Sequence, residues 1–126
     1  MEPNRRGEHG SGTMLTVLLL ALTMLIGGVA AVVVGYVVAA HRARVAADAV
    51  AFSVAAWPGA QSCRQAAPVA ARNGARLVSC AYAGDEVDHV ITVVVAVGVR
   101  PRPAGLPAEV SARAYAGTLQ PAPSPR

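Results

Sequence analysis

The feature that most constrains this chain of 126 residues is one uninterrupted apolar run near its start. The 28 residues from Thr13 to Ala40 include no Asp, Glu, Lys, Arg, His, Asn or Gln. A helix that crosses a bilayer needs about 20 apolar residues, whereas the apolar region of a cleaved secretory signal has only about 7–15. The rest of the chain is too short to enclose such a helix in a soluble core. The run therefore predicts a single transmembrane helix over residues 13–40.

Composition limits the classes of function. The chain is 54% hydrophobic and 14% charged, while a soluble domain carries about 25% charged residues. All eleven basic residues are Arg, and the formal net charge is +4. The arginines are scattered and only 4% of the residues are aromatic, a pattern that argues against nucleic-acid binding. The mild excess of positive charge is better suited to anionic lipid headgroups or to an acidic neighbour.

The charges beside the apolar run leave its orientation open. Arg5 and Arg6 precede the run, and Arg42 and Arg44 follow it, so the positive-inside rule does not choose a side. Residues 1–12, a tail or a possible leader, are too few to form a domain, so the larger C-terminal part is the one expected to be translocated. We therefore expect a single-pass protein of the plasma membrane with a cytoplasmic N-terminus and an extracytoplasmic C-terminal unit.

The two cysteines, Cys63 and Cys80, both lie in that C-terminal unit. A lone pair of cysteines in a small region is typical of a disulfide in an oxidising compartment. The bond would close a loop of about 18 residues, which corresponds to roughly 3 kcal/mol in the chain-entropy description. Two buried free thiols are the alternative. A zinc site is disfavoured because the distant His89 does not supply ligand spacing.

Helical character continues beyond the apolar run. Residues 41–56 are rich in Ala and contain neither Gly nor Pro. Four of them share one helical face: Val45, Ala49, Phe52 and Ala56. Trp57-Pro58-Gly59 then ends the helix, because Pro lacks an amide donor and Gly releases the backbone. The sequence therefore predicts an amphipathic extension over 41–57, in a rod about 66 Å long in total.

Small residues recur every four positions along this helix. They are Gly27, Ala31, Gly35 and Ala39 in the apolar run, followed by Ala43, Ala47, Ala51 and Ala55. Helices in lipid associate closely across such ridges. Each four-residue step turns the ridge by about 40°, so a crossing partner would touch only two or three positions. The ridge predicts helix packing with other subunits, although an Ala-rich composition also produces such ridges by chance.

Beyond the rod, residues 60–116 predict a small α+β unit. A short helix is expected to end at Asn73-Gly74, where Gly suits the C′ position. It would begin either at Ser62, which opens an S-x-x-Q capping box, or near Pro68. Three alternating runs then predict an antiparallel meander with strands at 76–82, 87–99 and 109–116.

The strand pattern also predicts which side chains share a face. In the first run, Val78, Cys80 and Tyr82 alternate onto one side. The second run is apolar on both faces, so we expect a central strand that is covered on both sides, or on one side by a partner. The Pro-rich linker 100–107 cannot pair continuously, and the Pro-rich tail 117–126 is expected to be disordered.

Few residues are arranged for catalysis. The three histidines, His9, His41 and His89, have no recognisable Ser or Cys nucleophile motif beside them. The acidic turn at 85–88 lacks the remaining ligands of an EF-hand loop. We therefore expect a non-enzymatic protein without a cofactor or a metal.

Two segments beside the apolar run carry a resemblance to a known family. His9-Gly10-Ser11-Gly12-Thr13 precedes the run, and Ala46-Ala47-Asp48-Ala49-Val50-Ala51 follows it. They resemble the small Arg-Gly-Ser entry motif and the Ala-Ala-Asp-Ala-Ala-Ala exit motif of TadE/TadG-like Flp pilus-assembly proteins. The run from Cys63 to Cys80, followed by a Val-rich strand, is similar to short actinobacterial TadE-like proteins encoded near a helicase and secretion genes. The resemblance covers about residues 7–116.

The resemblance implies a pilin-like or pseudopilin-like subunit of a tight-adherence (Tad, Flp, type IVc-like) pilus or secretion system. The implied partners are other subunits through the transmembrane helix and, indirectly, a secretion ATPase and platform proteins. The family also implies cleavage by a prepilin peptidase after Gly10 or Gly12. Filament-forming pilins carry Glu at the fifth mature position, where this chain has Leu15 or Val17. This departure favours an assembly or accessory role over a major filament subunit.

Two alternatives stay open from the sequence. The chain could be a membrane-tethered extracytoplasmic binding or sensing module unrelated to pili. It could instead be released as a small secreted protein after cleavage near Ala39-Ala40-His41. Contact with other subunits through the helix separates the first alternative from a pilin-like role, and the N-terminus of the mature chain separates the second.

Overall fold

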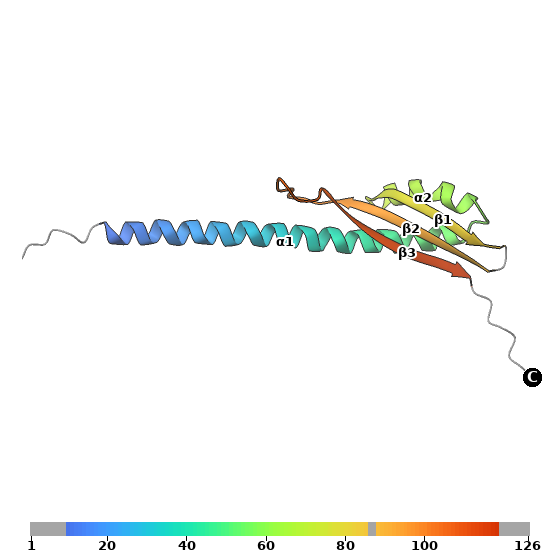
Figure 1. Ribbon diagram of the computed structural model, residues 1–126, viewed down its shortest axis with the longest axis horizontal. Helices are drawn as coiled ribbons and strands as arrows, with labels where there is room; N and C mark the ends of the chain where they lie inside the picture. The colour runs from blue at the N-terminus through green and yellow to red at the C-terminus, as the bar shows by residue number, and fades with distance from the viewer. Residues whose placement is uncertain (1–9, 86–87, 119–126) are drawn as a thin grey trace, which may run out of the picture.

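The computed structural model describes residues 10–85 and 88–118. Its elements in chain order are α1 (Ser11–Ala55), α2 (Gln61–Arg72), β1 (Arg76–Gly84), β2 (His89–Gly98) and β3 (Glu109–Thr118). Figure 1 shows the sheet and α2 gathered along the C-terminal half of α1. The predicted α+β class and order of elements are confirmed. Of the two predicted tails, 1–9 and 119–126 lie outside the described residues, whereas 117–118 belong to β3.

The long helix α1 is continuous over 45 residues, about 67 Å at 1.5 Å per residue. The apolar run and its extension therefore form one rod, as predicted. The rod ends before Pro58, whose ring would clash with the preceding turn. Gly59 then adopts a φ of +56°, a left-handed backbone that reverses the chain toward α2.

The C-terminal half of α1 packs on the sheet through small side chains. The core includes Ala43, Ala46, Ala47, Val50, Ala51 and Val54 from α1, Ala66 and Ala70 from α2, and Ile91, Val93 and Val95 from β2. Because alanines bring the helix close, the branched side chains of β2 fill the space between the layers. We refer to α2, the sheet and residues 39–55 of α1 together as the lobe.

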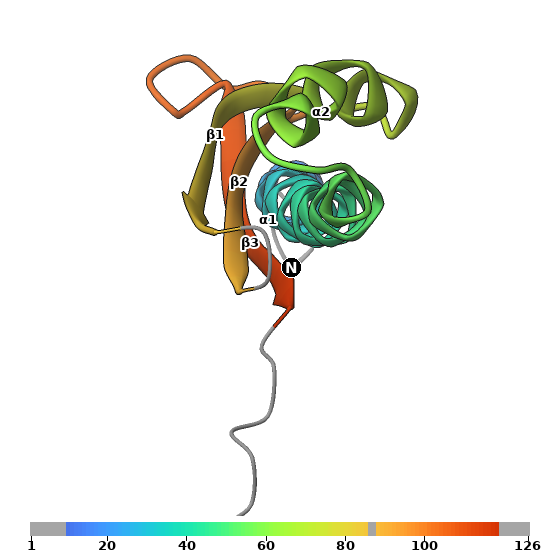
Figure 2. The same cartoon turned by 90° about the vertical axis from the view of Figure 1, so that its right-hand side faces the viewer.

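The apolar stripe expected on the extension faces away from the sheet. Val45 is 53% exposed and Phe52 is 83% exposed, while the opposite, Ala-rich side of α1 is buried. The structure differs from the hydrophobicity pattern here because α1 is enclosed by both the sheet and α2 (Figure 2). That crowded side accommodates alanine better than phenylalanine.

The start of α2 also differs from the prediction. The helix begins at Gln61, and the cap residue Ala60 makes no side-chain hydrogen bond. Ser62 lies inside the first turn, where its hydroxyl donates to the carbonyl of Gly59 at 2.7 Å. The predicted capping box is therefore wrong, and so is a start near Pro68, which lies inside the helix.

The end of α2 confirms the predicted glycine stop. The amide of Gly74, at a φ of +68°, donates to the carbonyl of Ala71. The amide of Ala75 donates to the carbonyl of Ala70. These two bonds form a Schellman motif, which satisfies carbonyls at the helix end. The chain then enters β1 directly.

The three strands form an antiparallel sheet in the order β1-β2-β3, so β2 is central as predicted. A β-bulge interrupts the register between Leu77 and Ser79. Leu77 therefore packs against the core, whereas Val78 is 50% exposed. The expected alternation of Val78 with Cys80 and Tyr82 is wrong because the bulge inserts one residue and reverses the faces.

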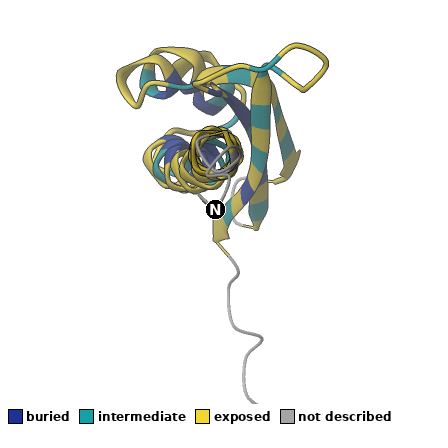
Figure 3. Cartoon of the chain, turned by 90° about the vertical axis from the view of Figure 1, so that its left-hand side faces the viewer, coloured by how far each residue is buried: buried dark blue, intermediate teal, exposed yellow. Residues whose placement is uncertain are grey.

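The helices cover only one face of the sheet (Figures 2 and 3). The uncovered face, which we call the outer sheet face, carries Ser79, Ala81 and Ala83 of β1, Val90, Thr92, Val94 and Ala96 of β2, and Ser111, Arg113 and Tyr115 of β3. Tyr115 is 64% exposed. The sequence predicts that the central strand is covered either on both faces or on one face by a partner. Within the described residues, α1 and α2 cover only one face of β2.

A disulfide joins the second helix to the sheet. Cys63 of α2 and Cys80 of β1 are bonded, with their Cα atoms 5.6 Å apart. The predicted pairing is confirmed, and free thiols are excluded. The bond attaches α2 to an edge strand of the sheet.

Candidate functional site

The N-terminal half of α1 extends away from the lobe with its apolar side chains uncovered (Figures 1 and 3). No residue in its most apolar stretch of 18 is buried. Met24, for example, is 78% exposed. Apolar surface of this extent marks a contact with lipid or with other proteins. The helix is long and apolar enough to cross a membrane.

The small-residue ridge divides into two parts. Ala39 is only 4% exposed, because it packs inside the chain together with the alanines that follow it. At Gly35, an added Cβ would lie 2.7 Å from the carbonyl oxygen of Arg100. Gly27 has no other atom within 4 Å of such a Cβ, and Ala31 is exposed. Of the four residues predicted for helix packing, the structure leaves Gly27 and Ala31 uncovered.

Helix geometry relates these uncovered residues to the outward stripe on the lobe. Gly27 precedes Val45 by 18 residues, and Val34 precedes Phe52 by the same number. Eighteen residues make about five turns at 3.6 residues per turn, so each pair points in one direction. The side of α1 opposite the sheet therefore carries exposed apolar side chains along both halves of the helix, interrupted by His41 and Asp48. It runs from the exposed half of the helix to the far end of the lobe, and we call it the outward helix face.

A loop connects the lobe to the exposed half of α1. The Pro-rich segment 99–108 leaves the sheet after β2 and lies beside the middle of α1 (Figure 1). Its ends are joined by a hydrogen bond from the amide of Val99 to the carbonyl of Ala108 at 2.9 Å. The segment was expected to be an unpaired linker, and it does interrupt the sheet. Its position against Gly35 could not be read from its composition.

Tyr36 fixes the loop from the helix side. Its hydroxyl donates to the carbonyl of Pro107 at 2.6 Å. Tyr36 is the one aromatic residue in the apolar run 13–40, and tyrosine is enriched where membrane helices meet water. The position of this tyrosine within the apolar run is the sequence signal that could have located the contact between the loop and α1. The loop therefore contacts α1 as far as Gly35, five residues before the predicted end of the membrane run.

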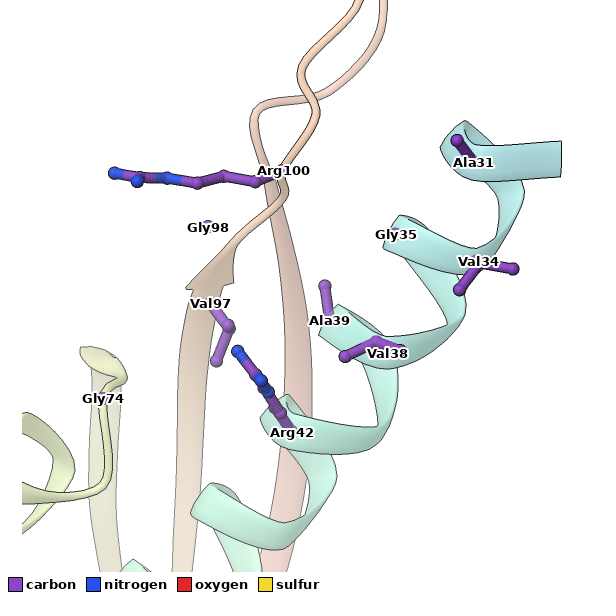
Figure 4. A pocket seen from close by; sticks show the side chains of 10 residues that line it. All are labelled: Ala31, Val34, Gly35, Val38, Ala39, Arg42, Gly74, Val97, Gly98 and Arg100. Carbon is purple, nitrogen blue, oxygen red and sulfur yellow. The ribbon is translucent and has the colours of Figure 1, made fainter. Parts of the chain in front are cut away.

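A groove of about 760 Å³ lies at this junction. Its lining residues are Ala31, Val34, Gly35, Val38, Ala39 and Arg42 of α1, Gly74 after α2, and Val97, Gly98 and Arg100 beside the end of β2. In Figure 4, the Arg42 side chain reaches from α1 toward Val97, and Arg100 extends from the start of the loop. The groove thus combines apolar walls with the guanidinium group of Arg42, and the Arg100 side chain lies at its rim and points away from α1.

The acidic residue at this end of the sheet does not neutralise these arginines. Glu109 pairs instead with Arg76, with a distance of 2.6 Å between Oε2 and Nη2. The hydrogen bond from Arg76, together with its charge, holds the pKa of the Glu109 carboxyl below its ordinary value. Within residues 10–85 and 88–118, the structure shows no ion pair for Arg42 or Arg100. The groove therefore carries uncompensated positive charge.

The remaining candidate residues stay apart from this junction. Gly10 caps the start of α1 and Gly12 lies in its first turn, and neither has an atom within 4 Å of an added Cβ. His89 stacks on Tyr82 at 5.5 Å between ring centroids, at the opposite end of β2. Among the described residues, no three His, Cys, Asp or Glu side chains cluster as metal ligands do. The expectation of a non-enzymatic protein stays a prediction.

No family model matches the chain, and neither the curated proteins nor the solved structures include one similar to it at a significant level.

Proposed function

We propose that this protein is a non-enzymatic, membrane-anchored component of a Tad (Flp, type IVc-like) pilus-assembly or secretion system. In this role it acts as a pilin-like or pseudopilin-like subunit. Its N-terminus lies in the cytoplasm, its helix crosses the plasma membrane once, and its lobe lies outside. It contacts neighbouring subunits directly, and the secretion ATPase and platform proteins through them.

One observation carries the proposal: a single helix is both the exposed apolar rod and the core of the lobe. No residue of its most apolar stretch is buried, while Ala47 and Val50 further along are fully enclosed. A rigid connection of this kind ties the position of the lobe to that of the membrane segment. A subunit that is ordered by packing of its membrane helices needs such a connection, whereas a tethered binding module functions with a flexible linker.

The outward helix face supports lateral packing. Gly27 and Ala31 permit close approach of a second helix within the membrane. Val45 and Phe52 extend the same surface outside it. On the opposite side of the lobe, the outer sheet face offers Val90, Val94 and Tyr115 to a second neighbour. Two separate surfaces with exposed apolar side chains on one small subunit are suited to an assembly with several copies or partners.

The disulfide supports the proposed orientation. The bond between Cys63 and Cys80 lies within the lobe. Structural disulfides persist in oxidising compartments and are rare in the cytosol. The disulfide therefore favours an extracytoplasmic lobe and, with one membrane crossing, a cytoplasmic N-terminus. The flanking charges alone did not choose between the two orientations.

Gly27→Leu tests the packing of the helix. The added side chain has open space within the monomer, so we expect normal membrane insertion with loss of inter-subunit crosslinks in membranes. Gly28→Leu is the matched control, because Gly28 is equally open and points about 100° away around the helix. Equal crosslinking in wild type and Gly27→Leu would contradict a packing role and favour a tethered monomeric module.

N-terminal sequencing of the mature chain tests the remaining alternatives. Cleavage after Gly10 or Gly12 would support processing by a prepilin peptidase. Release near Ala39-Ala40-His41 would support a secreted protein. That bond lies inside continuous α1, where Ala39 is buried against the lobe, so we expect it to stay intact.

A further inference from the structure

The structure relates the lobe to the edge of the membrane. The segment of α1 from Thr13, where the apolar run begins, to Val34, the residue before the loop contact at Gly35, has 22 residues. At 1.5 Å per residue it is about 33 Å long, close to the roughly 30 Å thickness of a hydrocarbon core. Gly35, Tyr36 and the loop 99–108 therefore lie at the level of the lipid headgroups, given the membrane anchoring proposed above.

Positive charge is concentrated at this end of the lobe. Arg42 and Arg100 line the groove, and Arg102 follows in the loop. Glu109, the acid at this end of the sheet, is engaged by Arg76. The described turn residues Asp85 and Asp88 lie at the other end of the sheet, where β1 leads into β2. Arg42, Arg100 and Arg102 thus lie at the membrane end of the lobe, with no ion pair among the described residues.

The groove between them suits an amphipathic molecule. Its α1 wall consists of Ala31, Val34 and Val38, which continue into the lipid-facing surface of the helix. Arg42 lies about 16 Å along the helix from Ala31. A volume of about 760 Å³ is within the usual range of ligand clefts, about 300–1,000 Å³. A small free anion would use the arginines and leave the apolar wall uncovered.

We propose that this groove binds an anionic glycerophospholipid of the leaflet facing the lobe. Its phosphate contacts the guanidinium group of Arg42 and that of Arg100, whose exposed side chain turns toward the groove when the lipid binds, and an acyl chain lies along Val34 and Ala31. Guanidinium groups match phosphate geometry and hold it with two parallel hydrogen bonds. The acyl chain thus covers Val34 and Ala31, which also belong to the proposed subunit contact, so the lipid forms part of that contact and fixes the depth of the lobe.

The test uses full-length protein in mild detergent and native mass spectrometry with added phosphatidylglycerol, phosphatidylcholine or inorganic phosphate. Wild type should retain phosphatidylglycerol in preference to phosphatidylcholine. In Arg42→Gln/Arg100→Gln, phosphatidylglycerol affinity should fall about 30-fold, since each basic residue near an anionic surface contributes roughly fivefold. The matched control, Arg64→Gln/Arg113→Gln, removes the same charge from exposed positions on α2 and the outer sheet face and should bind like wild type.

Three results would overturn the inference. The first is equal retention of phosphatidylglycerol and phosphatidylcholine by wild type. The second is an equal loss of phosphatidylglycerol affinity in the two double variants, and the third is displacement of the lipid by inorganic phosphate alone, which would indicate a free-anion site. Unchanged thermal unfolding of both variants checks that the fold is intact. Resistance of the wild-type protein to alkaline extraction from membranes separates the two proposals. An extracted protein refutes membrane anchoring and this site together, whereas an anchored protein without lipid preference refutes this site alone.

Discussion

Replacing Gly35 with Ala should loosen the loop 99–108 from α1. The new Cβ would lie 2.7 Å from the carbonyl oxygen of Arg100 and 3.4 Å from the Cδ of Pro101. The first distance is shorter than a Cβ tolerates, and the neighbouring atom is backbone, so the loop itself must move. Overpacking of this kind costs about 1–3 kcal/mol. Alanine also recovers about 1 kcal/mol of helix propensity, so the net loss of stability should be about 0–2 kcal/mol.

Gly27→Ala separates the effect of the loop contact at position 35 from the effect of the higher helix propensity of alanine. Gly27 has no atom within 4 Å of an added Cβ, so this variant gains the helix propensity without the clash. The difference in unfolding free energy between Gly27→Ala and Gly35→Ala should therefore be about 1–3 kcal/mol. Tyr36→Phe removes the hydrogen bond to Pro107 and should cost about 1 kcal/mol through the same loop.

Hydrogen exchange of the full-length protein in detergent provides the local readout. The amide of Val99, bonded to Ala108 at 2.9 Å, should exchange faster in Gly35→Ala and Tyr36→Phe, and at the wild-type rate in Gly27→Ala. Thermal unfolding of the same samples provides the global readout. If Gly35→Ala matches Gly27→Ala in both measurements, the loop does not rest on the helix, and the location of the membrane boundary at Gly35 is refuted.

Three further expectations concern the lobe. Replacing Cys63 and Cys80 together with Ser should lower the free energy of unfolding by about 3 kcal/mol, and equal melting temperatures of the oxidised wild type and the variant would contradict a stabilising bond. Ile91→Ala should cost about 2–5 kcal/mol because that side chain is fully buried, whereas Val90→Ala on the outer sheet face should change stability by less than about 1 kcal/mol. The folded-state pKa of Glu109 is lowered, so its ion pair stabilises the fold above the unfolded-state pKa, and this contribution is lost as the pH falls through the folded-state value. Glu109→Gln should accordingly flatten the acid side of a stability–pH profile, and an unaltered profile would refute the assignment.

The two proposals lead to different failures in the cell. Gly27→Leu should disrupt contact between subunits while leaving lipid retention intact, because Gly27 lies outside the groove lining. Arg42→Gln/Arg100→Gln should release the lipid while leaving Gly27 available to a neighbouring helix. Measuring both properties in both variants therefore shows whether assembly and lipid binding are independent.

Local pattern was sufficient for most elements of the fold. The apolar run, the Pro-Gly stop after the rod and the Gly74 stop after α2 each act within a few residues, so the sequence alone located them. The disulfide followed from the scarcity of cysteine, since Cys63 and Cys80 have only each other as partners. The meander followed from alternation and turn residues between the strands.

The sequence did not predict which side chains are buried where burial depends on contact with residues distant in the sequence. The stripe containing Val45 and Phe52 is hydrophobic, yet the opposite side, which consists of alanines with Val50 and Val54, is the buried one, because the sheet and α2 both pack on that side. The exposure of Val78 depends on a bulge in its pairing with β2. A period-two pattern in one strand carries no information about that insertion.

The sequence by itself determined that this chain has a helix able to cross a membrane and a cross-linked α+β unit after it. Hydrophobicity, cysteine count and turn residues act locally, so they can be read along the chain. Only the tertiary structure decided where the lobe meets that helix. The contact of the loop with Gly35 and Tyr36 joins residues about 70 positions apart. Steric fit between such distant segments arises only once the chain has folded.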